Sequence, residues 1–235
     1  MQARFGSTRL PGKVLASLGE RTVLAEVLHR CRSIPGIDDV CCAVPEGHRD
    51  DDVADEVDHS GVHLVRGSHD DVLARYAKAA IETEADIVMR VTSDCPLIDP
   101  YLCGDVLSLR QTENADVAAN DFEPAFPHGL DCEVFTADAL HRADAAATEM
   151  SDREHVAPWI RRELSFRRAS LVGPGGEMAR QRWTLDWPED LDFMRELFAL
   201  GETPLRWQET FGLIKQHPHL DAINQNRFVE RVADA

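Results

Sequence analysis

The chain has 235 residues, of which 43% are hydrophobic and 29% charged, a balance typical of a soluble globular protein and not of a disordered or fibrous one. Its formal net charge of −17 argues against non-specific nucleic-acid binding, because an acidic surface repels the phosphate backbone. No apolar run approaches the roughly 18 residues that a membrane-spanning helix needs, and the N-terminus lacks the apolar core of a signal peptide. We therefore expect a cytoplasmic protein with neither a membrane nor a nucleic acid as partner.

Helix-like and strand-like patterns alternate along the first half of the chain. Apolar spacing predicts helices over residues 22–32, 50–59 and 70–84, and strands over residues 39–44, 62–65 and 86–92. This alternation predicts an α/β fold with a mostly parallel sheet that is covered by helices on both faces. Ligands bind such sheets beyond the carboxyl ends of the strands, so the residues that follow these three strands should face one crevice.

The pattern changes between about residues 118 and 176. Short strands, a hairpin candidate over residues 124–135 and helices over residues 137–147 and 152–164 are predicted there, followed by a strand over 182–185 and a proline-started helix over 188–200. No linker-like stretch separates these parts. We predict one domain over residues 1–235, with an inserted subregion over about 118–176 and a C-terminal tail over 218–235.

The N-terminus is unusual for this architecture. A sheet of this kind normally opens with a strand that leads into a glycine-rich loop, yet only a few residues precede the loop here. We expect either that the chain starts further upstream or that the sheet lacks a central strand.

The N-terminal loop, residues 4–13, combines three cations and two hydroxyls with two glycines and a proline. Glycines let backbone N–H groups approach phosphate oxygens, arginines bind these oxygens in pairs, and a lysine adds a point charge. The loop is therefore a candidate triphosphate site, with a basic N-terminal turn as the alternative. It is not a Walker loop, because five residues separate Gly6 from Gly12 where that motif has four, and Val14 replaces the magnesium-binding hydroxyl.

Two aspartates follow predicted strands. Asp94 comes directly after the strand over 86–92, and Asp186 after the strand over 182–185. Carboxylates in these positions could hold Mg²⁺ against phosphate oxygens, and two of them facing one crevice would suit a magnesium-dependent phosphoryl or nucleotidyl transfer. Each could instead be a helix cap or a turn residue.

A further group of polar residues lies in the predicted subregion. Asp131 and Glu133 share one face if their segment is a strand, His128 precedes them, and Arg153 and His155 lie in the first turn of a predicted helix. These side chains could bind a polyhydroxylated or acidic substrate. Equally, Arg153 could form a surface ion pair and His155 could be structural.

With these residues assembled, the sequence resembles the spore coat polysaccharide biosynthesis protein F family, whose members are cytidylyltransferase-like and related to the acylneuraminate and KDO cytidylyltransferases. The resemblance rests on residues 2–4, 6–13, 66–68, 71–76, 94–100, 129–135, 152–156, 183–186 and 188–191. It implies a three-layer α/β sandwich of the nucleotide-diphospho-sugar transferase type, and a homodimer through the inserted subregion. The implied reaction transfers CMP from CTP to a sugar acid or related acceptor with release of pyrophosphate, in surface polysaccharide biosynthesis.

The resemblance also implies roles for single residues. The catalytic set would be Arg4, Lys13, Asp94 and Asp186; the triphosphate would be held by Arg4, Ser7, Arg9 and Lys13; Asp94 and Asp186 would bind Mg²⁺; and the backbone around Ala43 would contact the base. Arg66 and Asp71 follow the strand over 62–65 and could line the nucleotide pocket. The polar residues of the subregion, His128 among them, are then candidates for binding the acceptor.

Two other functions stay open. A glycosyltransferase that consumes a nucleotide-sugar would share the sheet and the crevice, but it does not explain a cation-rich loop suited to three phosphates. A catalytically weak nucleotide-binding partner of a polysaccharide assembly is suggested by the short segment that precedes the loop.

Overall fold

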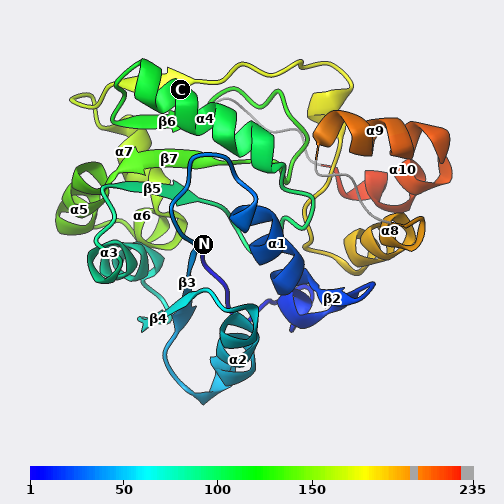
Figure 1. Ribbon diagram of the computed structural model, residues 1–235, viewed down its shortest axis with the longest axis horizontal. Coiled ribbons are helices and arrows are strands. Elements are labelled where there is room, and N and C mark those ends of the chain that lie inside the picture. The colour runs from blue at the N-terminus through cyan, green and yellow to red at the C-terminus, as the bar shows by residue number, and fades with distance from the viewer. Residues whose placement is uncertain (202–205, 229–235) are drawn as a thin grey trace.

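The central sheet is built from two groups of strands in the computed structural model, which describes residues 1–201 and 206–228 (Figure 1). The described strands of this sheet are β3 (Cys41–Pro45), β4 (His63–Gly67), β5 (Ile87–Arg90), β6 (Val117–Ala119), β7 (Glu133–Thr136) and β8 (Arg168–Ser170). β3 pairs with β4, and the other four are ordered β5-β7-β6-β8. β3/β4 and β6/β8 are parallel, whereas β7 is antiparallel to both of its neighbours.

The first residues of the chain join the two groups. Gln2 forms parallel β-bridges to Ala43, in β3, and to Thr92, just beyond β5. The N–H of Ala43 donates to the carbonyl of Met1 (2.8 Å), and the N–H of Ala3 donates to the carbonyl of Ala43 (3.2 Å). This short segment occupies the central position of the sheet. At that position the sequence predicts either that the chain starts further upstream or that a strand is missing. Among the described strands of the sheet, only β7 is reversed, which confirms a mostly parallel sheet.

Helices cover both faces of the sheet. One face carries α1 (Val23–Arg32), α2 (Asp51–Ser60) and α4 (Pro100–Thr112), and the other carries α3 (Val72–Glu82), α5 (Ala137–Ala146) and α7 (Ala157–Arg162). Neighbouring residues of β7 show the division, because Val134 packs against the first group of helices and Phe135 against the second. The predicted three-layer α/β sandwich is therefore confirmed. None of the helices in the described ranges is long and apolar enough to cross a lipid bilayer.

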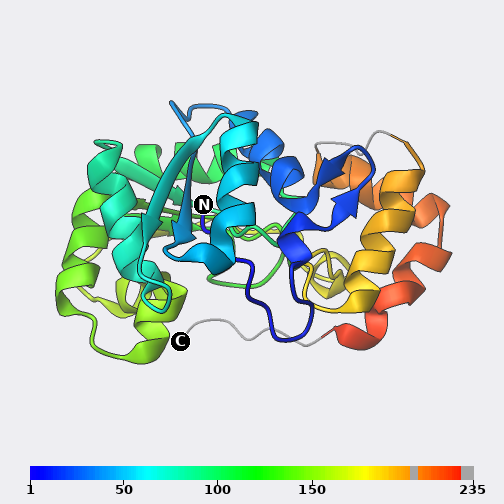
Figure 2. The same ribbon diagram turned by 90° about the horizontal axis from the view of Figure 1, so that it is seen from below.

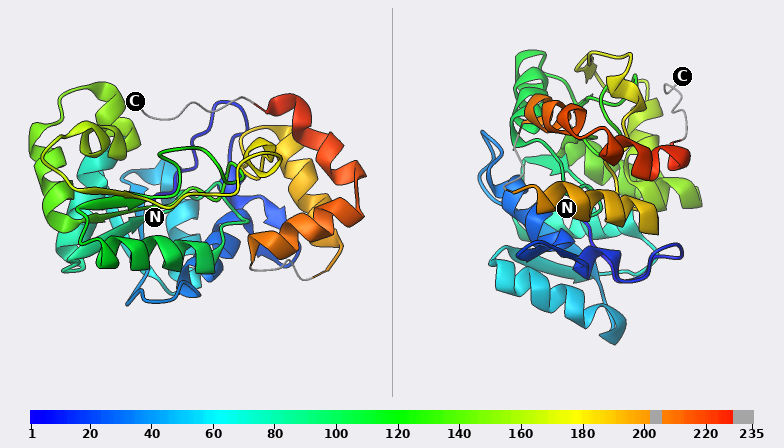
Figure 3. Two further views of the ribbon diagram at one scale, coloured as in Figure 1. Left: turned by 90° about the horizontal axis from the view of Figure 1, so that it is seen from above. Right: turned by 90° about the vertical axis from the view of Figure 1, so that its right-hand side faces the viewer.

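A third apolar cluster lies at one end of the sheet. It joins α8 (Pro188–Ala199), α9 (Trp207–Gln216) and α10 (His219–Asn224) to the hairpin of β1 (Ser17–Leu18) and β2 (Arg21–Thr22). Figure 3 shows these three helices together, at the end of the molecule opposite α5. Leu220 is fully buried, so the predicted tail from residue 218 begins as a packed helix; its last seven residues, 229–235, lie outside the described residues.

The predicted elements of the first half agree with the structure. The three predicted strands correspond to β3, β4 and β5, and the three predicted helices to α1, α2 and α3. The helices predicted over 137–147 and 188–200 correspond to α5 and α8. Strands β6, β7 and β8 all derive from residues 117–170, so much of the predicted subregion belongs to the central sheet.

Three predictions in the second half are wrong. The helix over 152–164 is broken into α6 (Met150–His155) and α7, because the ring of Pro158 cannot continue the α6 hydrogen-bond pattern. The hairpin over 124–135 does not form, since β7 pairs with β5 and β6 instead. The strand over 182–185 is reduced to one β-bridge, between His128 and Arg182.

Candidate active site

Three charged side chains from distant parts of the chain meet at the end of β5. Lys13 Nζ donates to Asp94 Oδ2 (2.8 Å), to Asp186 Oδ1 (3.0 Å) and to the carbonyl of Leu185 (2.7 Å). The Lys13 side chain is 13% exposed and each aspartate side chain 27% exposed, so solvent reaches the group. We call these three residues the lysine cluster. The predicted convergence of the N-terminal loop and the two strand-end aspartates is thus present.

Backbone contacts hold the two aspartates side by side. Leu185 N–H donates to the carbonyl of Asp94 (2.8 Å), which fixes the 183–186 segment against the end of β5. Gly129 crosses this segment so closely that a Cβ on it would lie 2.5 Å from the Trp183 carbonyl oxygen. Its φ of 113° is also one that other residues rarely adopt, so glycine is required here.

A second layer of side chains orients Asp186. Asp190 Oδ2 accepts from the N–H groups of Asp186 and Trp187, both at 2.9 Å. Arg182 donates to both oxygens of Asp190 at 2.8 Å and to Asp186 Oδ2 at 3.2 Å. The buried Asn224 amide of α10 donates to Asp190 Oδ1 (3.0 Å). The sequence analysis misses these three positioning residues, although an acid at the third position of a proline-started helix is a capping signal that marks Asp190.

The electrostatics of the lysine cluster favour the charged forms of Lys13 and Asp94. Although burial opposes charge on Asp94, the ammonium of Lys13 holds the pKa of that carboxyl below its usual range. Burial likewise works against the Lys13 charge, but the two carboxylates outweigh it and raise the lysine pKa. One cation thus lies between two anions, which leaves the cluster with a net negative charge.

The other loop residues lie around this cluster. Figure 2 shows the loop (dark blue) running across the middle of the molecule, between the ends that carry α5 and α8–α10. Arg9 Nη1 is 3.9 Å from Asp186 Oδ1, and its guanidinium lies over the ring of Trp187. Arg4 Nη2 is 3.7 Å from Glu154 of α6. Ser7 Oγ accepts from the N–H of Leu10 (3.4 Å), a turn contact that shapes the loop.

Four further predicted site residues are bonded to other parts of the chain. Arg66 donates to Asp51 (3.1 Å) and to the carbonyl of Gly47. Asp71 caps α3 through the N–H of Ala74 and also accepts from Arg153, whose Nε lies 3.0 Å from both carboxylate oxygens, so a ligand would have to open this pair. Both backbone groups of Ala43 are bonded within the sheet, which leaves neither of them directed at a base.

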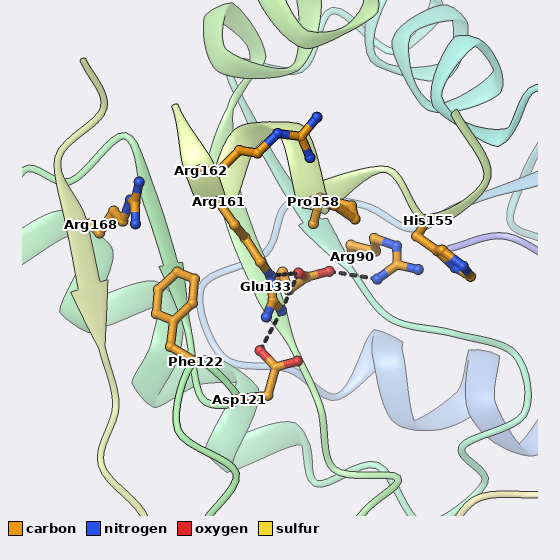
Figure 4. A pocket seen from close by; sticks show the side chains of 10 residues that line it. Arg90, Asp121, Phe122, Glu133, His155, Pro158, Arg161, Arg162 and Arg168 are labelled. Atoms are coloured by element: carbon orange, nitrogen blue, oxygen red, sulfur yellow. Dashed lines mark hydrogen bonds and ion pairs between the residues drawn. The ribbon is translucent and has the colours of Figure 1, made fainter. Parts of the chain in front are cut away.

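Two of the remaining predicted residues line a cavity of about 560 Å³ (Figure 4). Its wall contains Glu133 and His155, together with Arg90, Asp121 and Arg161, which the sequence analysis did not single out. His128 Nε2 lies 3.9 Å from Asp131 Oδ2, and Asp131 also accepts from the N–H of Gly129 (3.3 Å). Lys13, Asp94 and Asp186 are not part of the cavity wall.

We call Arg90, Asp121, Glu133 and Arg161 the arginine cluster. Arg90 Nη1 donates to Glu133 Oε2 (2.6 Å), and Arg161 bonds the other oxygen, with Nε at 2.8 Å. Arg161 Nη2 also donates to Asp121 Oδ1 (2.6 Å). Burial opposes charge on Glu133, but the two guanidiniums prevail and lower its pKa, whereas burial and the Glu133 charge raise the pKa of Asp121 to about 7.

Two carboxylates around one ammonium can also share a metal ion. Mg²⁺ is typically bound by one or two protein carboxylates and completes its shell with substrate phosphates and water. Asp94 and Asp186 match that requirement, since they already contact a single cationic atom. No group of three or more His, Cys, Asp or Glu side chains within residues 1–201 and 206–228 could hold a metal by itself.

The loop lysine that faces two carboxylates in an α/β sandwich is the arrangement predicted for a nucleotidyltransferase, and the relatives of the chain confirm this class. The chain belongs to the cytidylyltransferase family, whose model matches residues 1–231. It is 30% identical over 227 residues to the spore coat polysaccharide biosynthesis protein SpsF of Bacillus subtilis, covering 93% of both chains. It is also 33% identical over 127 residues to the 3-deoxy-manno-octulosonate cytidylyltransferase of Maricaulis maris, over 52% of this chain and 46% of that one.

A solved structure supports the same assignment. A cytidylyltransferase from Leptospira borgpetersenii matches 98% of this chain and 97% of its own, with a TM-score of 0.87 and 28% identity. The predicted family and fold are thereby confirmed.

Proposed function

We propose that the protein transfers CMP from CTP to a sugar-acid or related acceptor, with release of pyrophosphate, in surface polysaccharide biosynthesis. The observation that carries this proposal is the position of Lys13 between Asp94 and Asp186. The name of one relative states cytidylyl transfer to a sugar acid, and the name of another states spore coat polysaccharide biosynthesis.

In this proposal the lysine cluster exchanges its cation. The ammonium of Lys13 moves from the two carboxylates to the incoming triphosphate, where Arg9 and Arg4 bind further phosphate oxygens. Asp94 and Asp186 are then free to bind Mg²⁺, with Arg182 and Asp190 keeping Asp186 in place. The bound Mg²⁺ would supply positive charge against the leaving pyrophosphate.

The chemical step needs no covalent intermediate on the protein. A hydroxyl of the acceptor forms a bond to the α-phosphorus of CTP as the bond from that phosphorus to the β-phosphate oxygen breaks. The electron pair of the broken bond leaves with pyrophosphate, and the proton of the hydroxyl passes to solvent. The role of the chain is to hold the two reactants in line and to stabilise the charge of the leaving group.

The test is pyrophosphate release from CTP with a panel of sugar acids, neutral sugars and phosphonates, with and without Mg²⁺. We expect release only when Mg²⁺ and an acceptor are both present, and a weaker signal with ATP, GTP or UTP. Transfer from a CMP-sugar or UDP-sugar with no use of CTP would contradict the proposal. Tight CTP binding without turnover of any acceptor would favour a nucleotide-binding partner instead.

We also propose that the protein is a homodimer through the predicted subregion. Met150, Leu164 and Val172 are the most exposed large hydrophobic residues of the described chain, at 83%, 92% and 74%, and all three lie in that subregion. Exposed apolar side chains of this kind favour an interface. Light scattering should give a dimer mass for the native chain and a monomer mass for the Leu164→Glu variant. A native monomer would contradict the dimer.

A further inference from the structure

The cavity beside β7 has the size and the position of a second substrate site. Its volume of about 560 Å³ falls within the range of small-molecule sites in proteins, about 300–1,000 Å³. It lies at the same edge of the sheet as the lysine cluster. Glu133 begins the reversed strand β7 and is paired with Arg90, which is four residues before Asp94 on the same chain segment. On its other side, Glu133 is paired with Ala119 of β6, two residues before Asp121.

Helix α6 links the cavity to the N-terminal loop. Glu154 lies 3.7 Å from Arg4 of the loop, and the next residue, His155, is part of the cavity wall. In Figure 4 the His155 ring lies beside the Arg90 guanidinium. The Arg90 and His155 end of the cavity is therefore the end nearest to the proposed phosphate site.

The cavity wall is more positive than a chain of net charge −17 would suggest. Four arginines and His155 line it, against two carboxylates. Arg162 is neutralised by the buried Asp152, whereas the exposed side chain of Arg168 forms no hydrogen bond or ion pair among the described contacts. The wall thus has an excess of positive charge, which favours an anionic ligand.

Arg90 is the guanidinium best placed to bind that anion. Only its Nη1 is bonded, to Glu133, while its buried Nε meets no acceptor in the described part of the chain. A buried donor without a partner is costly, and functional sites are where such donors are found. Glu133, which Arg161 also bonds, holds the Arg90 guanidinium through Nη1, and in Figure 4 the guanidinium points toward His155.

Backbone strain marks the same place. Val156 has φ 70° and ψ −58°, a conformation that a β-branched residue adopts only when its surroundings impose it. It is fully buried and separates α6 from α7, the two helices that supply His155, Pro158, Arg161 and Arg162 to the wall. Backbone strain of this kind is concentrated at binding sites.

We propose that this cavity is the acceptor site and that Arg90 and His155 bind an anionic group, a carboxylate or a phosphonate, next to the attacking hydroxyl of the acceptor. This inference rests on the proposed function for the identity of the second substrate, but the anion site itself does not require turnover. The arginine cluster positions Arg90, and Phe122 offers an apolar surface for the body of the ligand (Figure 4).

The experiment measures binding without CTP, by NMR titration of the protein with small probes. Glycolate carries a carboxylate next to a hydroxyl, hydroxymethylphosphonate is its phosphonate counterpart, and glycolamide is its neutral counterpart. We expect one of the two anions to bind and glycolamide to bind at least about tenfold more weakly. The anion that binds more tightly identifies the group that the acceptor carries.

Variants locate the site. His155→Ala and Arg90→Lys should each weaken binding of the preferred anion by about tenfold, and Arg90→Lys retains a charge beside Glu133 so that the fold is kept. Arg66→Ala is the matched control, because Arg66 bonds Asp51 and lies outside the cavity. Equal binding of glycolamide and the anions, or unchanged binding in both cavity variants, would overturn the proposal. Failure of pyrophosphate release with every acceptor would contradict only the proposed function.

Discussion

Two charge clusters lie at the same edge of the sheet, and they are built in opposite ways. In the lysine cluster one ammonium lies between two carboxylates that are each 27% exposed. In the arginine cluster one carboxylate, Glu133, is 4% exposed and lies between two guanidiniums. A lysine on a flexible stem can leave its partners for a phosphate, but a buried carboxylate cannot lose an arginine without leaving charge unpaired. The lysine cluster is therefore suited to exchanging its cation, and the arginine cluster to holding its side chains in fixed positions.

Breaking the rigid cluster should have the largest effect. Glu133→Gln leaves Arg90 and Arg161 without their shared carboxylate, so we expect the free energy of unfolding to fall by about 3–5 kcal/mol. Urea denaturation at pH 7 measures this change. Arg168→Ala is the control from the same cavity wall, and it should change stability by less than about 0.5 kcal/mol because its side chain is exposed. A Glu133→Gln variant as stable as the control would show that the cluster is not a structural unit.

Removing one anion of the lysine cluster should affect turnover instead. We expect Asp94→Asn to lower kcat for pyrophosphate release by about 10²-fold or more, because the variant loses a carboxylate that would hold Mg²⁺ against the leaving pyrophosphate. Its urea midpoint should stay close to that of the native chain, since Asp94 follows β5 at a solvent-reached position. Near-normal turnover of Asp94→Asn would remove the metal assignment of both aspartates.

Parts of this contrast could be predicted from the sequence. Lys13 and Asp94 are placed by local signals, a glycine-rich loop and the end of β5, whereas Asp186 is reached from a predicted strand that is reduced to one β-bridge in the structure. The alternation of helices and strands in the first half is also a local pattern. For these reasons the fold class and the lysine cluster were within reach of the sequence alone.

The arginine cluster was not predictable in this way. It depends on the insertion of β7 between β5 and β6, a pairing of segments more than 40 residues apart, and only that register brings Arg90 opposite Glu133. The break at Val156 depends on tertiary packing that overrides a helical pattern, although Pro158 is a local sign of it. Sequence spacing also does not show that Arg153 and Asp71, two predicted site residues, bond each other.

Removing the Lys13 ammonium should strengthen metal binding by Asp94 and Asp186. In the absence of nucleotide, the ammonium and a divalent cation compete for the same two carboxylates. We expect Lys13→Ala to bind Mn²⁺ about tenfold more tightly than the native chain, because removing the ammonium frees both anions. Electron paramagnetic resonance of free Mn²⁺ measures this directly. Arg9→Ala serves as the control, since Arg9 is 3.9 Å from Asp186 and should have a smaller effect. Equal Mn²⁺ affinity of Lys13→Ala and the native chain would contradict the exchange of cations.

Asp121, the second carboxylate of the arginine cluster, should make the stability of the protein depend on pH. Asp121 has a pKa of about 7 in the folded protein, raised by burial and by the Glu133 charge, against about 3.9 in an unfolded chain. Between these two pH values the folded protein holds a proton that the unfolded chain has released, so stability falls as the pH rises from about 4 to about 7. Asp121→Asn removes that titration and should be more stable than the native chain at pH 8, by at least about 1 kcal/mol, with little difference at pH 4. Urea denaturation of the variant and of the native chain at the two pH values tests this. If the variant is less stable than the native chain at pH 8, and more so than at pH 4, then Asp121 is ionised and acts as a second permanent partner of Arg161.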